Sequence, residues 1–134
     1  METELVEDDP SIRDEAQLWR RINPNWMVFD ENQGRSRVSS QAFQNLEGDK
    51  LSVLLEELVR ETGRRPEDLI ASFPGFGLAT ISAGFARELQ QGVIRAPEPD
   101  EPAHSHLVGK KSKSVQKALA RHAEWVVVPP GPAS

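Results

Sequence analysis

The sequence contains no cysteine, and it has no run of about 18 apolar residues of the length that spans a bilayer. Without cysteine the chain cannot form disulfides, cysteine zinc sites or thiol nucleophiles. The first ten residues are acidic, whereas a secretory signal begins basic and then becomes apolar. We therefore expect a soluble, cytoplasmic protein that makes no membrane contact.

With 134 residues, the chain has the length of one domain. We expect an acidic leader at 1–15, a single folded domain at 16–128 and a proline-rich tail at 129–134. The leader has seven acidic residues and one basic residue, so its net charge is −6 and the rest of the chain carries about +1. This composition predicts a mobile leader, although an acidic leader can also fold back over a basic face as a mimic of an anionic ligand.

Alternating apolar and polar residues predict several short strands. Residues 17–22 fit a strand or the end of a short helix. A turn at Asp30–Gly34 separates two β-prone segments, 26–29 and 37–43, which predicts a hairpin. Further strands are expected at 93–95, 104–108 and 125–128.

The clearest predicted helix covers Leu51–Thr62, because five apolar residues recur at helical spacing. Ser52 is expected to cap its start and Gly63 to end it. A short helix should begin at Pro66, residues 78–91 should form a strand to about Ala83 and then a helical turn from 86, and a last helix should cover 114–124. This order predicts an α+β fold: a mostly antiparallel sheet of about five or six strands, with two to three helices packed on one face.

A lysine-rich segment lies where a predicted strand passes through glycine into the last helix. Free N–H groups at a helix start and several ammonium groups together favour anions. The anion-binding candidates are Gly109, Lys110, Lys111, Ser112, Lys113, Lys117 and Arg121. A nucleotide-binding P-loop is excluded, because it requires glycine where His104 stands. Either a solvated lysine-rich loop or contact with phosphate or nucleic acid explains this segment.

His104 and His106 are two residues apart on a predicted strand, so their side chains should lie on the same face. Two imidazoles can bind one metal ion or one phosphate. A metal would need further ligands, for which the candidates are His122, Glu98, Asp100 and Glu101. Because the spacing is not diagnostic, we assign no metal site and expect no cofactor.

Arg20 and Arg21 precede Ser39, Ser40 and the histidines. An arginine on one strand with a serine on the next resembles the arrangement that the ADP-ribosyltransferase family uses for NAD. This resemblance implies an enzyme whose catalytic candidates are Arg20, Ser40, His104 and His106. The alternative is that the arginines form surface ion pairs with nearby acids.

Phe73 and Phe76 flank a Pro-Gly turn. They are either core anchors or, if exposed, a surface that binds a partner. Since the chain carries no specific catalytic motif, the favoured interpretation is a non-enzymatic accessory or regulatory domain whose partner is another protein. An anion-binding module for nucleic acid or a phosphorylated ligand is the alternative, followed by a small enzyme that uses His104 and His106.

Overall fold

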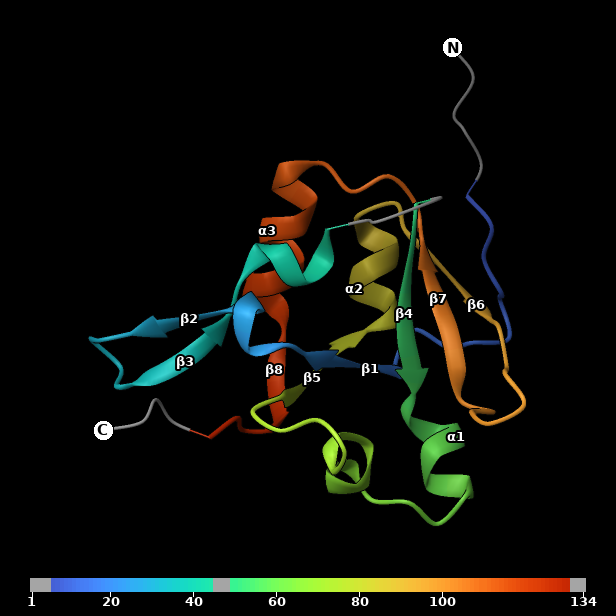
Figure 1. Cartoon of the computed structure of the whole chain (residues 1–134). Coiled ribbons are helices and arrows are strands. Elements are labelled where there is room, and N and C mark those ends of the chain that lie inside the picture. The colour runs from blue at the N-terminus through green and yellow to red at the C-terminus, as the bar shows by residue number, and fades with distance from the viewer. Residues whose placement is uncertain (1–5, 45–48, 131–134) are drawn as a thin grey trace.

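A six-stranded antiparallel sheet forms the centre of the part of the chain described here, residues 6–44 and 49–130 of a computed structural model (Figure 1). The strand order is β6-β7-β4-β1-β5-β8. The strands are β1 (Gln17–Ile22), β4 (Lys50–Leu55), β5 (Gly77–Ser82), β6 (Gly92–Arg95), β7 (His104–Val108) and β8 (Glu124–Val127). The α+β class and the antiparallel sheet predicted from the sequence are therefore confirmed.

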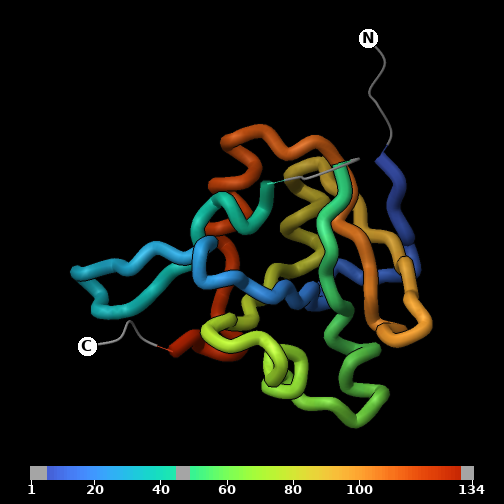
Figure 2. The backbone as a smooth tube through the Cα atoms, viewed as in Figure 1, coloured from blue at the N-terminus to red at the C-terminus, as the bar shows by residue number. Residues whose placement is uncertain are grey.

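The predicted hairpin is present as a separate two-stranded sheet, β2 (Met27–Asp30) paired with β3 (Arg35–Val38). Asp30 organises the turn, since its carboxylate accepts the N–H of Asn32 and its carbonyl accepts the N–H of Gly34. Gly34 has a φ of 68°, which favours glycine. The hairpin projects to one side of the main sheet (Figures 1 and 2).

The second hairpin strand is shorter than predicted. It ends at Val38, and the chain continues as the 3-10 helix η2 (Ser40–Phe43). Ser39 caps η2 by accepting the N–H of Gln41, while Ala42 and Phe43 are fully buried in the core. These two neighbouring side chains join the same apolar cluster, whereas a strand would have pointed them to opposite faces.

The helical segments divide between the two faces of the sheet instead of gathering on one. The first face carries η2, α2 (Ala83–Glu88) and α3 (Lys113–His122), whose side chains join a large apolar cluster. The second face carries α1 (Glu56–Glu61) and the 3-10 helix η3 (Pro66–Ile70), which pack around Trp19. A further 3-10 helix, η1 (Pro24–Trp26), connects β1 to the hairpin.

The predicted helix at Leu51–Thr62 is wrong in its first half. Residues 50–55 form β4, and α1 begins only at Glu56. Leu51 and Val53 face one apolar cluster while Leu54 faces the other, so the segment also fits a strand that is covered on both faces. Pairing of β4 with β1 and β7 satisfies its backbone, and local spacing cannot show this. Ser52 consequently lies in a strand and caps no helix.

The later elements lie close to their predicted positions. Residues 17–22 form a strand and not a helix end, and Pro66 begins η3. Helix α2 starts at Ala83, three residues before the predicted turn, because Ser82 caps it by accepting the N–H of Phe85. Gly63 adopts the expected left-handed conformation, with a φ of 78°.

Part of the acidic leader lies along the outer edge of β6. The N–H of Asp9 donates to the carbonyl of Val93, and the N–H of Val93 donates to the carboxylate of Asp8. A Cβ atom on Gly92 would lie 1.8 Å from the carbonyl oxygen of Glu7, so this approach requires glycine. The described part of the leader, residues 6–15, thus contacts the sheet edge, whereas its composition favoured a mobile leader. Residues 1–5 lie outside the described part, as do 131–134 of the predicted tail.

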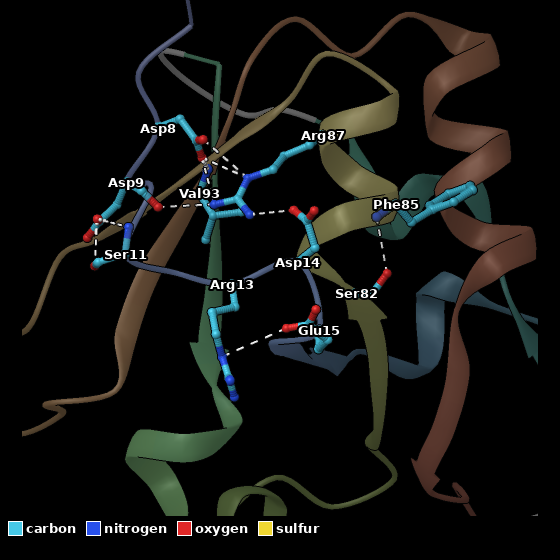
Figure 3. A network of polar contacts seen from close by, with 10 residues as sticks. All are labelled: Asp8, Asp9, Ser11, Arg13, Asp14, Glu15, Ser82, Phe85, Arg87 and Val93. Atoms are coloured by element: carbon cyan, nitrogen blue, oxygen red, sulfur yellow. Dashed lines mark hydrogen bonds and ion pairs between the residues drawn. The ribbon is translucent and has the colours of Figure 1, made fainter.

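Arg87 of α2 is the centre of this attachment (Figure 3). Its guanidinium forms ion pairs with Asp14 at 2.8 Å and Asp8 at 3.2 Å, and it donates to the carbonyl of Asp9 at 3.0 Å. Asp9 also lies 3.8 Å from Arg95. Three acidic side chains of the leader, Asp8, Asp9 and Asp14, are therefore paired with arginines of α2 and β6.

Within the described residues, no helix is both long enough and apolar enough to cross a bilayer.

We expect Arg87→Met to lower the free energy of unfolding by about 1–3 kcal/mol, because it removes several charge-assisted hydrogen bonds from a partly buried position. Urea unfolding followed by tryptophan fluorescence measures this change. Arg13→Met is the matched control: the Arg13 side chain is 79% exposed, and its ion pair with Glu15 is 3.8 Å long. The control should lower the free energy of unfolding by less than about 0.5 kcal/mol. Equal effects of the two substitutions would contradict the role of Arg87 in attaching the leader.

Candidate functional site

His104 and His106 lie on the second face of the sheet, as their spacing predicted. Their rings are nearly perpendicular, with centroids 5.0 Å apart. The Nδ1 atom of His104 is 2.9 Å from the carbonyl oxygen of Ala96, and its Nε2 atom is 3.1 Å from the hydroxyl of Ser52. A carbonyl can only accept, so Nδ1 carries the proton and Nε2 is left to accept the hydrogen of Ser52.

Arg20 lies where β1 and β4 separate. These strands pair at Leu18–Leu55 and Trp19–Leu54, and beyond these pairs the Arg20 side chain reaches from β1 to the backbone of β4. It donates from Nε to the carbonyl of Ala42 and from Nη1 to the carbonyl of Ser52, both at 2.7 Å. Burial lowers the pKa of Arg20 to about 10. Arg20 therefore remains charged at neutral pH and places a cation beside Ser52.

A small cavity of about 180 Å³ joins these groups. Its lining combines the polar side chains of Arg20, Ser52 and His104 with the apolar side chains of Trp19, Trp26, Leu54 and Phe76. The structure therefore brings Arg20 and His104, which the sequence analysis had grouped as catalytic candidates, together with Phe76, which it had assigned to a partner-binding pair. Ser52 was missed because it was interpreted as a helix cap. The sequence did contain a signal for Ser52: it is a polar residue between the apolar residues Leu51 and Val53, as expected on one face of a strand.

Phe73 and Phe76 form a tilted pair with centroids 5.1 Å apart. Phe73 is 36% exposed, and the Arg21 guanidinium lies 4.7 Å from its ring centre. Phe76 is partly buried against the small cavity. Of the two predicted partner-binding residues, Phe73 is thus the one presented to solvent.

Of the other candidate ligands, Glu98 lies near the histidine pair, with a carboxylate oxygen 3.6 Å from Nε2 of His104, whereas His122 and Glu101 are engaged elsewhere. His122 lies on α3 and stacks on Phe85, with centroids 3.8 Å apart. Glu101 is engaged by both guanidinium nitrogens of Arg64 at 2.7 Å. Among residues 6–44 and 49–130, no group of three or more histidine or acidic side chains is placed to hold a metal ion.

The lysine-rich segment does not form one surface. Lys111 is only 8% exposed, and its ammonium donates to the carbonyls of Leu107 at 3.2 Å and Gly109 at 2.9 Å. Burial lowers the pKa of Lys111 to about 8. Ser112 caps α3 by accepting the N–H of Val115, and Gly109 has a φ of 135°. Lys111 is therefore a structural residue that faces inward.

Lys117 and Arg121 instead line a much larger groove of about 950 Å³, between the β2–β3 hairpin and the α3–β8 segment. Arg35 and Arg37 of β3 line the same groove, and Glu124 is the one acidic side chain among the described residues that border it. We call this surface the basic groove. Its remaining lining includes the hydroxyl side chains of Ser36, Ser39 and Ser40 and the apolar side chains of Val28, Trp125 and Val128.

The indole N–H of Trp125 donates to the carbonyl of Ser36 at 3.0 Å, which ties β8 to the hairpin. The Trp125 ring also lies directly over Gly77, where a Cβ atom would come within 2.6 Å of it. Ser40 borders this groove whereas Arg20 borders the small cavity, so the two residues of the predicted NAD-type arrangement line different sites. Sequence reasoning missed Arg35 and Arg37. They are two residues apart on a hairpin strand, so both occupy exposed positions on the same face, and this spacing was the available signal.

Comparison with protein-family models, curated proteins and solved structures gave no match.

The lowered pKa of Lys111 predicts that stability rises between about pH 8 and pH 10. In this range the unfolded chain still holds the Lys111 proton, whereas the folded chain releases it, so raising the pH favours the folded state. Urea unfolding at several pH values measures the slope. Lys111→Met should reduce the slope, and Lys113→Met, which replaces an exposed lysine of the same segment, should leave it unchanged. The same slope in the Lys111→Met variant would show that another group is responsible.

Proposed function

We propose that the protein binds a phosphate-bearing ligand, single-stranded nucleic acid, in the basic groove. The observation that carries this proposal is that Arg35 and Arg37 on β3 border the same groove as Lys117 and Arg121 on α3. Four cations around one groove repel one another unless an anion lies between them. A chain of phosphates is the ligand that best matches such a row of positive charges.

The acidic leader does not cancel this charge. Asp8, Asp9 and Asp14 pair with Arg87 of α2 and Arg95 of β6, and β6 lies on the opposite side of the main sheet from the hairpin (Figure 1). The net charge of −5 for the whole chain therefore does not indicate the charge of the groove, because most of the excess acidic residues lie in the leader. None of residues 6–15 of the leader borders the groove.

The lining of the groove also suits the bases of a nucleic acid. Trp125 and the apolar side chains of Val28 and Val128 provide a surface on which a base can stack. The hydroxyl groups of Ser39 and Ser40 can donate to phosphate or sugar oxygens. Cations beside an aromatic surface are the combination by which proteins bind single strands without reading their sequence.

The test is fluorescence anisotropy with a labelled single-stranded oligonucleotide of about ten nucleotides, which is within the length that one small domain covers. Binding should weaken with salt, with a slope near −0.7 for each phosphate neutralised, or about −3 for four cations. The double substitution Arg37→Glu with Lys117→Glu should lower affinity at least tenfold.

The double substitution Lys113→Glu with Arg65→Glu makes the same charge change at exposed positions outside the groove. It should have a much smaller effect on affinity, which separates the groove from the overall charge. If the wild-type protein does not bind the oligonucleotide, or if both double variants lose affinity equally, the proposal is wrong.

A further inference from the structure

We propose that Ser52 and His104 form a nucleophile and base pair that hydrolyses small esters, with Arg20 stabilising the negative charge that develops. This site is separate from the basic groove, since the two share no lining residue. The proposal therefore does not depend on nucleic-acid binding.

The hydrogen bonds of His104 favour this role for Ser52. The Ala96 carbonyl holds the Nδ1 proton at 2.9 Å, which directs the Nε2 lone pair toward the Ser52 hydroxyl at 3.1 Å. A nucleophile within hydrogen-bond reach of a base, with the base oriented by a third group, is the arrangement that activates serine. Here a backbone carbonyl takes the orienting role.

The charges around the pair suit proton transfer. An oxygen of the Glu98 carboxylate lies 3.6 Å from Nε2 of His104, where its charge stabilises the imidazolium that forms when the histidine takes a proton. Ser52 is exposed, while the side chain of His104 is only 15% exposed. The hydroxyl is thus accessible to a substrate, and the base is held in place by its surroundings.

Arg20 provides the group that can bind an oxyanion. Its Nε and Nη1 atoms donate to the carbonyls of Ala42 and Ser52, and its Nη2 atom donates to none of the described residues. Arg20 and Ser52 line the same cavity, so the remaining guanidinium donor can serve an oxygen of a bound substrate. Because both carbonyls fix the guanidinium, this donor needs no reorganisation during the reaction.

The size of the cavity indicates the substrate class. At about 180 Å³, it is smaller than the roughly 300–1,000 Å³ of sites for drug-sized ligands. Trp19, Trp26 and Phe76 give it apolar walls. A short acyl group of a few carbons fits this space, and the alcohol part of the ester would extend into solvent from the exposed Ser52.

The reaction consumes one ester and one water. The Ser52 oxygen bonds to the carbonyl carbon as its proton passes to Nε2 of His104, and the ester C–O bond breaks as that proton moves to the leaving alcohol. Water then bonds to the acyl carbon and gives a proton to His104, and the acid leaves as Ser52 regains that proton. The products are one carboxylic acid and one alcohol, and no cofactor is consumed.

The experiment is covalent labelling with a fluorophosphonate, which reacts with activated serines, followed by mass spectrometry to locate the label. Hydrolysis of p-nitrophenyl acetate and p-nitrophenyl decanoate is measured in parallel. Wild-type protein should be labelled at Ser52 and should prefer the acetate. Ser52→Ala should lose both label and turnover, and His104→Gln should lower both rates about a hundredfold or more.

The matched controls are His122→Gln and Ser72→Ala, which replace a histidine and an exposed serine outside the cavity. Both should keep wild-type labelling and turnover. Urea unfolding of Ser52→Ala checks that the fold is retained, as expected for an exposed side chain whose bond is to His104. Label at other serines only, no label at all, or full turnover by Ser52→Ala would overturn the proposal.

Discussion

The guanidinium of Arg20 connects segment η2, beside the basic groove, with strand β4, which carries Ser52 of the small cavity. It lies where β1 and β4 diverge, and it donates to η2 through Ala42 and to β4 through Ser52. Segment η2 follows the hairpin and packs against α3, so one side of Arg20 supports the basic groove. The other side fixes the backbone of Ser52. A partly buried cation with two carbonyl partners thus positions both candidate sites, because no neighbouring carbonyl can move without losing a strong hydrogen bond.

Charge is separated across the molecule. The acidic leader is drawn to Arg87 and Arg95 beside β6, and the hairpin arginines remain available at the other end of the sheet. Lysine is used in two different ways along one short segment. Lys111 turns inward to satisfy two carbonyls, whereas Lys117, further along α3, borders the groove. The net charge of the chain and the number of lysines in a segment therefore do not predict where an anion can bind. The local charge depends on the direction in which each side chain points.

Local patterns predicted the features that depend on neighbours in sequence. The two histidines share a face because strand side chains alternate, and the hairpin forms because Asp30 and Gly34 favour a turn. Residues 51–55 were misassigned because their apolar spacing fits both a helix and a strand buried on two sides. Pairing with β1 and β7 decides between them, and those partners are distant in the chain.

The sequence by itself determined the fold class, the positions of most strands, the shared face of His104 and His106, and the excess of acid in the leader. The tertiary structure alone decided that Ser52 meets His104, that Arg37 and Lys117 border one groove, and that Lys111 is buried. The reason is physical. Periodicity and turn chemistry act over a few residues, whereas a functional site joins strands and helices whose contacts depend on sheet order and on which face each side chain occupies.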